Sequence, residues 1–297
     1  KKNIFIKLNN IKYPYFLPLI KTLKYINPDV IYNRTASALT GIAAYYAKRH
    51  CQLIFHIASD KDLEHYALSF YNFYLLLEKQ LIQYGINKAN KVIAQSNFQA
   101  EQLKINYNKQ ATIISNGHPI PDTCSKISNK IKIIWIANWK PIKQPEIFVK
   151  LAKELSYFSN IEFNMIGRIG NYNTLADEAQ NHGIDVKGVI PNEEVNELLA
   201  QGHILVNTSK QEGFSNTFIQ AWMRKVPVVS LQVDPDGILE NKGIGFCSGS
   251  FEQLVLDTKK LVEDLQLLES MGDKARKYGI KHHSLDNMDR IIEIINS

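Results

Sequence analysis

Short runs of β-branched and other apolar residues alternate with longer amphipathic stretches along this sequence. Such alternation is typical of parallel sheets whose strands are connected by helices. Strands are predicted at 29–32, 52–57, 91–95 and 111–115, then at 131–137, 161–166, 185–189, 204–207 and 228–231. Helices are predicted at 37–49, 61–84, 98–105, 145–158 and 192–200. The pattern therefore predicts an α/β fold.

The alternation stops in a polar, proline-punctuated stretch, which is typical of a linker between domains. We therefore predict a Rossmann-like domain at 1–120, a linker at 121–130, a second Rossmann-like domain at 131–280 and a final helical segment at 281–297 that packs back on the first domain. Two doubly wound domains are expected to bind ligands at the carboxyl ends of their strands, in a cleft between the domains. The first domain has few strands and the sequence does not start with methionine, so we expect this domain to be truncated at its N-terminus.

Composition excludes several classes of protein. Cys51, Cys124 and Cys247 are too far apart for a zinc site or a disulfide framework, which indicates a reducing, cytoplasmic location. No apolar run is long enough to span a membrane. The net charge of +6 suits phosphates or acidic lipid headgroups, but the lysines are scattered and form no nucleic-acid-binding block.

The segment Asn207–Trp222 carries the strongest chemical signal. It is predicted to run from a strand through a loop containing Glu212 and Gly213 into a helix that opens near Asn216. Free backbone N–H groups at such a helix start suit a diphosphate, and Glu212 is then available to bind sugar hydroxyls. An ordinary strand-loop-helix crossover with a surface glutamate is the alternative.

The whole segment resembles the signature of the retaining glycosyltransferases of family 4, which have the two-domain GT-B fold. Glu212, Gly213 and Phe214 match its Glu-Gly-Phe, and the Pro-Val-Val at 227–229 matches its end. Gln220 stands where the family has a second glutamate that binds the ribose, and Lys225 replaces a glycine. The resemblance implies donor contacts from Gly213, Phe214, Ser215, Asn216 and Gln220.

Two further segments extend the resemblance. Residues 138–145 resemble the family's phosphate clamp, in which Lys143 matches the lysine and Asn138 replaces an arginine; Lys140 is a candidate for the second cation. Phe55-His56 resembles the Thr-Phe-His whose histidine faces the donor sugar, although a lone histidine at a strand end is also common in cores. The implied catalytic residues are Glu212, His56 and Lys143.

Other polar residues of the first half are open to two interpretations. Arg34 and Asp60 follow strands and are candidates for acceptor contacts. Arg34 equally suits a surface position, and for Asp60 the position of a helix cap is favoured. The stripe of Tyr66, Phe70, Phe73, Tyr74 and Leu77 has helical spacing and suits a core or the docking of a lipid-linked acceptor.

Asp234-Pro235-Asp236 fits a pattern by which another glycosyltransferase fold holds manganese. Two carboxylates at this spacing share a cation only when both point inward, and the following Gly237 favours a turn. We therefore predict no metal site and no cofactor.

The resemblance implies transfer, with retention, of a sugar from a nucleoside-diphosphate sugar to a hydroxyl of a glycan or lipid-linked acceptor in surface polysaccharide synthesis. Peripheral association with the inner face of a membrane is a further expectation, and nucleic acid is not expected as a partner. A catalytically silent, nucleotide-sugar-binding regulator of another transferase is the main alternative, and a GT-B epimerase is a weaker one.

Overall fold

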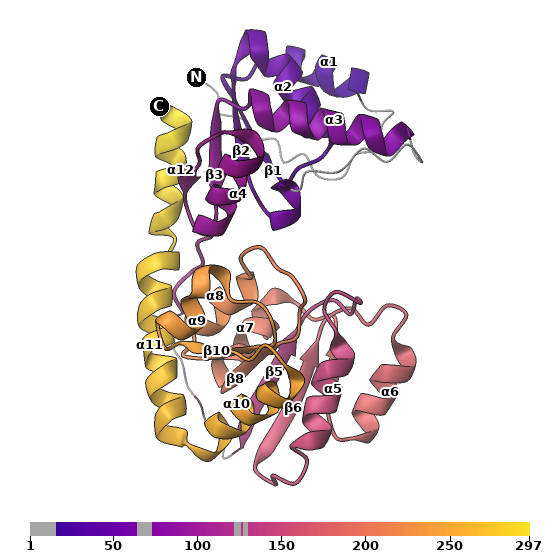
Figure 1. Cartoon of the computed structure of the whole chain (residues 1–297), viewed down its shortest axis with the longest axis vertical. Coiled ribbons are helices and arrows are strands. Elements are labelled where there is room, and N and C mark those ends of the chain that lie inside the picture. Colours follow the sequence, from indigo (N-terminus) through magenta and orange to yellow (C-terminus); the bar gives the residue numbers. More distant parts are fainter. Residues whose placement is uncertain (1–15, 64–72, 122–125, 127–129) are drawn as a thin grey trace. The chain divides into compact units, whose positions relative to one another are not determined.

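The computed structural model describes residues 16–63, 73–121, 126 and 130–297. The chain divides into two compact units. Unit 1 consists of residues 1–116 and 287–297, and unit 2 of residues 117–286. Each unit contains one parallel sheet with helices packed on it (Figure 1), so the prediction of an α/β fold is confirmed.

The described residues of unit 1 form a four-stranded parallel sheet in the order β1-β2-β3-β4. Its strands are β1 (Val30–Arg34), β2 (Gln52–His56), β3 (Lys91–Ala94) and β4 (Thr112–Ile113). Its helices are α1 (Phe16–Ile26), α2 (Ala38–His50), the 3₁₀-helix Asp60–Leu63, α3 (Phe73–Lys88), α4 (Asn97–Tyr107) and α12 (Asp286–Asn296).

Alternation along β2 explains how this sheet is covered on both faces. Leu53 and Phe55 point into the core that α1 and α2 share, whereas Ile54 points to the opposite face. On that face Ile295 of α12 is buried against Ile54, and the terminal helix thus completes the core of unit 1. The Lys91 ammonium holds the end of α12 by donating to the Ile294 carbonyl (2.9 Å).

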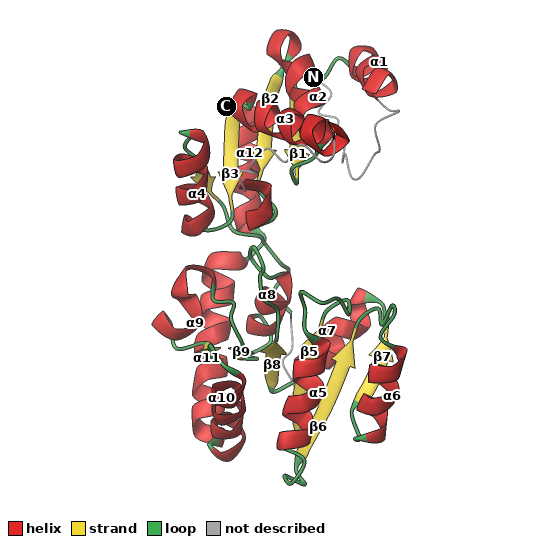
Figure 2. Cartoon of the chain, turned by 45° about the vertical axis from the view of Figure 1, so that its right-hand side comes forward, coloured by secondary structure: helices red, strands yellow, loops and turns green. Residues whose placement is uncertain are grey.

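The described residues of unit 2 form a six-stranded parallel sheet in the order β10-β9-β8-β5-β6-β7. Figure 2 shows β8, β5, β6 and β7 in this order. The strands are β5 (Ile131–Ile136), β6 (Ile161–Ile166), β7 (Asp185–Gly188), β8 (Ile204–Asn207), β9 (Val228–Ser230) and β10 (Gly245–Cys247). The helices are α5 (Pro145–Glu154), α6 (Asn173–Asn181), α7 (Asn192–Gln201), α8 (Asn216–Trp222), the 3₁₀-helix Pro235–Gly237, α9 (Ile238–Asn241), α10 (Phe251–Glu263) and α11 (Leu265–His283).

The strand order of unit 2 positions its functional loops. The chain builds outward from β5 through β6 to β7, then crosses to the other side of β5 and builds outward again from β8. This is the order of the dinucleotide-binding Rossmann fold, in which ligands bind at the carboxyl ends of the two strands where the direction reverses. In unit 2 those strands are β5 and β8, which pair directly.

Several elements differ from the sequence prediction. The sequence predicts one helix over 61–84, whereas the structure has the 3₁₀-helix Asp60–Leu63 and then α3 from Phe73. Tyr66 and Phe70 of the predicted aromatic stripe lie outside the described residues. The short strand β10 and helices α1, α6, α9, α10 and α11 were not among the predicted elements, whereas α12 lies within the predicted final helical segment. Strand β10 (Gly245-Phe246-Cys247) contains no β-branched residue, unlike the equally short β9, which begins Val228-Val229.

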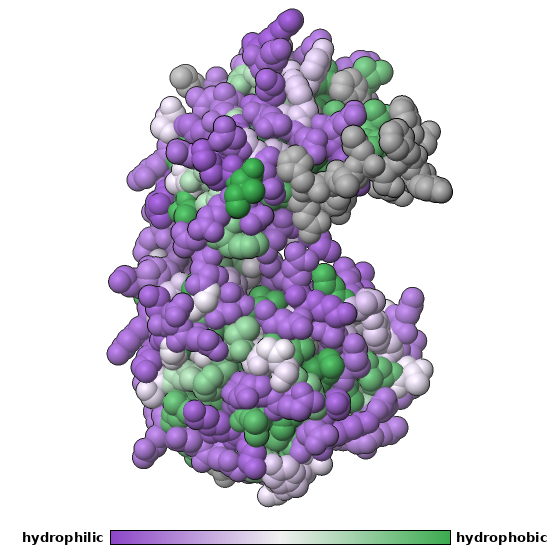
Figure 3. Space-filling model, in the orientation of Figure 1, coloured by the Kyte–Doolittle hydropathy of each residue, from purple (hydrophilic) through white to green (hydrophobic). Residues whose placement is uncertain are grey.

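No described helix combines the length and apolar character that crossing a membrane requires. In the view of Figure 3, hydrophobic residues form separate groups among hydrophilic ones over the described surface.

Candidate active site

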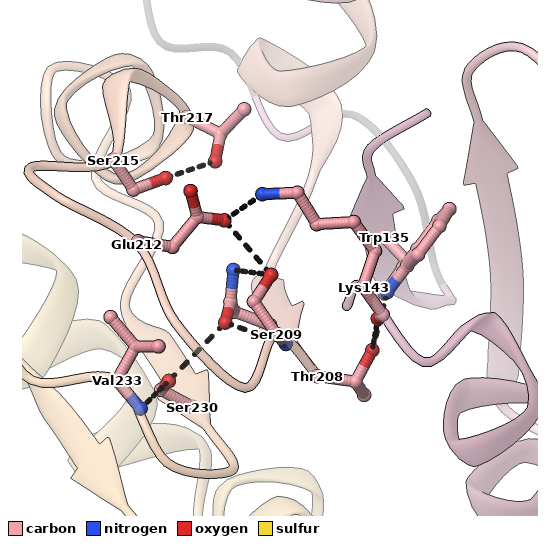
Figure 4. Close-up of polar contacts among 10 residues, drawn as sticks. Trp135, Lys143, Thr208, Ser209, Glu212, Ser215, Thr217, Ser230 and Val233 are labelled. Atoms are coloured by element: carbon pink, nitrogen blue, oxygen red, sulfur yellow. Dashed lines mark hydrogen bonds and ion pairs between the residues drawn. The ribbon is translucent and has the colours of Figure 1, made fainter. Parts of the chain in front are cut away.

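The loops that follow β5 and β8 come together at the switch point of unit 2. Lys143 lies in the first loop and Glu212 in the second, and their side chains form an ion pair (Figure 4). The same Glu212 oxygen accepts a hydrogen bond from the Ser209 hydroxyl (2.8 Å). No described residue donates a hydrogen bond to the other carboxylate oxygen, which therefore remains available as an acceptor.

Buried polar contacts fix the position of these two loops. Trp135 of β5 donates its indole N–H to the Thr208 hydroxyl (2.8 Å), and this hydroxyl donates to the backbone carbonyl of Lys143 (2.6 Å). The Lys210 amide donates to the Ile142 carbonyl (2.9 Å). Because Trp135 is fully buried and Thr208 is inaccessible, the backbone that carries Lys143 is held rigidly against the β8 loop.

The loop after β6 is tied to the loop after β5 through Asn138. Its side-chain oxygen accepts from the Arg168 amide (3.2 Å), and the Trp139 amide donates to the Arg168 carbonyl (2.9 Å). Asn138, which replaces an arginine of the family pattern, thus makes a structural contact. The same contacts place Arg168, an exposed cation, in the loop next to that of Lys143.

Gly167 allows these two loops to approach. Its φ is 137°, and a Cβ atom here would lie 1.9 Å from the Ala137 carbonyl oxygen. Gly170, in the same loop, has φ 62°, and the nearest atom to its Cβ position is the Trp139 carbonyl oxygen at 4.0 Å.

We expect Gly167→Ala to destabilise unit 2 strongly, because it combines backbone strain with a steric clash. The cost is about 3 kcal/mol, or roughly 10 °C in the melting temperature. Gly170→Ala is the matched control and should change the melting temperature by less than about 3 °C. Equal melting temperatures for the two variants in a thermal denaturation experiment would contradict this account of the loop contact.

Helix α8 begins at the end of the β8 loop and has only seven residues. Ser215 precedes it, and its hydroxyl lies 2.8 Å from that of Thr217. Asn216 is exposed, and its side-chain oxygen lies 3.4 Å from Nε2 of His118. Phe214 is buried against Trp222 and His283 and so anchors the loop in the core.

Gln220 lies on α8 and is oriented by two asparagines of α7. Its side-chain nitrogen donates to the side-chain oxygens of Asn192 (3.1 Å) and Asn196 (3.3 Å). Among the described residues none donates to its side-chain oxygen. The amide therefore keeps one acceptor atom where the family pattern has a carboxylate.

In unit 1, His56 ends β2 and is 1 % exposed. Its Nδ1 forms a hydrogen bond with the Tyr32 hydroxyl, and its Nε2 has no partner among the described residues. Burial, with a contribution from the Arg34 charge, lowers the pKa of His56 to about 3. This imidazole is therefore neutral near pH 7 and offers a single unpaired ring nitrogen.

Arg34 and Asp60 take part in hydrogen bonds at the same edge of the unit 1 sheet. Arg34 donates to the Asn116 side-chain oxygen (2.8 Å), and Asn116 donates to the side chain of Gln95 (2.7 Å). Asp60 begins the 3₁₀-helix and accepts from the Gln99 side chain (3.0 Å). The carboxyl ends of β1, β2 and β3 and the segment after β4 thus share one polar region.

Asp234 and Asp236 lie in the turn that contains the 3₁₀-helix Pro235–Gly237. The Asp234 carboxylate accepts from the Leu239 amide (2.8 Å), and Asp236 has φ 56°. Burial raises the pKa of the Asp234 carboxyl. Over the part of the chain that the structure describes, no group of three or more His, Cys, Asp or Glu side chains is arranged to hold a metal ion.

The structure adds residues that the sequence analysis did not single out. Ser209 and Thr208 position Glu212 and Lys143, Arg168 lies beside the clamp, and Asn192 and Asn196 orient Gln220. Ser209 and Thr208 lie within the signature segment, and Arg168 follows a predicted strand. Their positions in the sequence could therefore have identified them as candidate site residues. The α7 asparagines carried no such signal, because their contact is tertiary.

Three solved structures illustrate what the chain resembles. The S. aureus TarM, solved with UDP and alpha-GlcNAc-glycerol, is 18% identical with a TM-score of 0.75, over 95% of this chain and 59% of TarM. HepE from Anabaena, in complex with UDP, is 18% identical with a TM-score of 0.76, over 95% of this chain and 82% of HepE. Sucrose-phosphate synthase from Thermosynechococcus elongatus is 14% identical with a TM-score of 0.75, over 95% of this chain and 79% of the synthase. The chain thus spans less than two thirds of TarM, and these likenesses show the GT-B fold.

Comparison by sequence gives the family. No curated protein sequence matches the chain significantly. Residues 2–120 match the family described as Glycosyltransferase Family 4, and residues 130–264 match the family described as Glycosyl transferases group 1. These two matches cover most of unit 1 and of unit 2, and the chain belongs to the family 4, or group 1, glycosyltransferases.

Proposed function

We propose that the chain transfers a glycosyl unit from a nucleoside-diphosphate sugar to a hydroxyl group of a glycan or lipid-linked acceptor, with retention of configuration. The observation that carries this proposal is the Lys143–Glu212 ion pair at the switch point of unit 2. It brings together a cation suited to a diphosphate and a carboxylate suited to sugar hydroxyls. TarM and HepE were solved with UDP, so uridine diphosphate is the first donor class to test.

Lys143 and Glu212 have different roles in this reaction. As the bond between the anomeric carbon and the diphosphate oxygen breaks, negative charge grows on the diphosphate, and the Lys143 ammonium stabilises it. Glu212 accepts hydrogen bonds from donor-sugar hydroxyls and stabilises the positive charge that develops at the anomeric carbon. Lys140 and Arg168 add positive charge from the surrounding loops.

The remaining proposed residues recognise the substrates. The Gln220 side-chain oxygen accepts a hydrogen bond from the ribose, with Asn192 and Asn196 holding the amide in place. In unit 1, His56 is the candidate contact of the donor sugar that the family resemblance implies, and Arg34 and Asp60 are the acceptor-side candidates. The acceptor hydroxyl bonds to the anomeric carbon, and its proton passes to the departing phosphate oxygen.

Donor binding and transfer are tested separately, with chelator present in both assays. UDP-sugars at one hundred times their dissociation constant should stabilise the protein by about 2.7 kcal/mol in a thermal-shift assay. We expect this stabilisation to persist in chelator, because lysine side chains supply the positive charge. Loss of binding in chelator that manganese restores, and that Asp236→Ala abolishes, would show a metal site instead.

Transfer is then followed by release of UDP in the presence of candidate acceptors. Release that depends on acceptor supports the proposed enzyme. Binding of a UDP-sugar without transfer to any acceptor would favour a silent regulatory partner, for which the replacements at Asn138 and Gln220 are the specific observations.

A further inference from the structure

A series of hydrogen bonds connects the loop after β9 to the carboxylate of Glu212. The Val233 amide donates to the Ser230 hydroxyl (3.1 Å), and this hydroxyl donates to the side-chain oxygen of Asn207 (3.5 Å). The Asn207 side-chain nitrogen donates to the Ser209 hydroxyl (3.3 Å), which donates to Glu212 (2.8 Å). These bonds can be followed from Ser230 to Glu212 in Figure 4. Asn207 and Ser230 are register partners at the ends of β8 and β9, so the series begins on the sheet itself.

Only one arrangement of protons satisfies every bond of this series. A backbone N–H can only donate, and the Ser209 amide donates to Asn207 (3.1 Å), so the carbonyl oxygen of the Asn207 side chain faces that amide. The NH2 group of the same side chain therefore faces the Ser209 hydroxyl. This hydroxyl accepts from Asn207, and an ionised carboxylate can only accept. The Ser209 proton is therefore directed at Glu212.

Burial makes this arrangement rigid. Ser230 is 0% exposed, Ser209 2% and Asn207 7%, so water competes little for these bonds. Hydrogen bonds in a series of this kind also polarise and strengthen one another. The Glu212 side chain is 18% exposed, so the buried network reaches the accessible surface at the carboxylate.

Donor binding increases the importance of Ser209 for this carboxylate. Lys143 and Ser209 both contact the same Glu212 oxygen. In the proposed reaction the Lys143 ammonium binds the diphosphate, and its hold on Glu212 weakens. The Ser209 hydroxyl donates to no other described residue, so it continues to fix one carboxylate oxygen and leaves the second oxygen directed at the donor sugar.

We propose that Asn207 and Ser230 are positioning residues, which act through the Ser209 hydroxyl to hold the Glu212 carboxylate toward the donor sugar. This inference rests on the proposed function, in which Glu212 stabilises the positive charge at the anomeric carbon. Such stabilisation requires a fixed geometry before the reaction begins. Loss of the two residues therefore lowers turnover, whereas nucleotide binding, to which Lys143 contributes, changes little.

The test combines Asn207→Ala with Ser209→Ala in the full chain. Each single variant should lower kcat for UDP release about tenfold, as expected for one hydrogen bond to a charged group. The affinity for UDP alone, measured by calorimetry, should change less than about twofold. The double variant should be as fast as Ser209→Ala, because Asn207 then has no hydroxyl to orient. Ser230→Ala should have a smaller effect, about threefold, since its bond to Asn207 is long.

Two matched controls separate positioning from a general loss of stability. Asn164 is an equally buried asparagine (2% exposed) on β6, and Asn164→Ala should lower the melting temperature but leave kcat within about twofold. Ser248→Ala is the control for Ser230, because the Ser248 hydroxyl donates to a carboxylate elsewhere in unit 2. An equal loss of turnover in the controls would overturn the proposal. Independent, additive losses at Asn207 and Ser209 would also overturn it.

Asn207→Asp keeps the proposal testable if Asn207→Ala does not fold. It keeps the size and the acceptor for the Ser209 amide, but its second oxygen accepts where asparagine donates. The Ser209 hydroxyl then turns away from Glu212, and kcat at about pH 8, where the new carboxylate is ionised, should again fall about tenfold. The fall should be less than about threefold in the Ser209→Ala background. Wild-type turnover in Asn207→Asp would overturn the proposal.

A crystallographic test separates this inference from the proposed function. Ligand-free structures of Lys143→Gln, with and without Asn207→Ala, show the Glu212 carboxylate without its cation. We expect a single carboxylate orientation when Asn207 is present, and a different or divided orientation when it is replaced. The same single orientation in both structures would overturn the inference even if the wild type transfers sugar. The expected difference would support the inference even if the wild type transfers nothing.

Discussion

Replacing Glu212 by glutamine should lower turnover roughly a hundredfold or more, by comparison with the loss of one electrostatic stabiliser from other active sites. Glutamine keeps the size and one acceptor oxygen, so the contact with the Ser209 hydroxyl can persist. It loses the negative charge that we expect to act on the developing positive charge at the anomeric carbon. The measurement is kcat for UDP release with a saturating donor and acceptor.

Nucleoside-diphosphate affinity of the same variant should stay equal or increase slightly, because Lys143 loses a competing carboxylate. A group that acts mainly in the transition state changes turnover more than ground-state binding. Glu178→Gln is the matched control, because it breaks a comparable ion pair with Lys153 elsewhere in unit 2. If Glu212→Gln retained the turnover of an active wild type, the catalytic site would have to lie elsewhere.

Replacing Lys143 by glutamine should, unlike the change at Glu212, act strongly on ground-state binding. We expect it to weaken nucleoside-diphosphate binding by about ten- to a hundredfold. Hydrogen bonds to charged groups contribute about 1.5–3 kcal/mol, and the change also leaves Glu212 without its cation beside the diphosphate. Binding is measured by calorimetry with the nucleoside diphosphate alone. Lys153→Gln is the matched control and should bind as the wild type does.

The ion pair makes a further prediction for the double variant. Lys143→Gln with Glu212→Gln should bind nucleoside diphosphate more tightly than Lys143→Gln alone, because the unpaired carboxylate is removed. The difference is a coupling energy between neighbouring residues. Lys140→Gln and Arg168→Gln should each weaken binding by less than about fivefold, as expected of exposed cations. Strictly additive effects at Lys143 and Glu212 would contradict the role given to the ion pair.

The α/β fold and five of the six strands of unit 2 were predictable, because buried parallel strands such as β5 and β8 appear in the sequence as apolar runs. Glu212 and Lys143 were identified as candidates because each lies in a segment that follows such a strand and resembles a family motif. The contacts that position them were not predictable. Thr208 and Trp135 are 73 positions apart, and nothing local to either residue indicates their hydrogen bond.

The contacts of Asn138 and Gln220 could not be predicted from the sequence either. In the sequence both are departures from a family pattern. The structure gives each of them partners, namely the Arg168 amide for Asn138 and the two α7 asparagines for Gln220. These partners explain why an uncharged side chain is accommodated at each position.

The sequence by itself determined the class of fold, five of the six strands of unit 2 and the loops that carry the candidate residues Lys143 and Glu212. Periodicity, composition and motifs are local properties, so they can be read without knowing which strands pair. Only the tertiary structure decided that β5 and β8 are neighbours, that Lys143 therefore meets Glu212, and that α12 belongs to the core of unit 1. The physical reason is that pairing and packing join residues distant in the chain, and their free energy comes from contacts that no short segment contains.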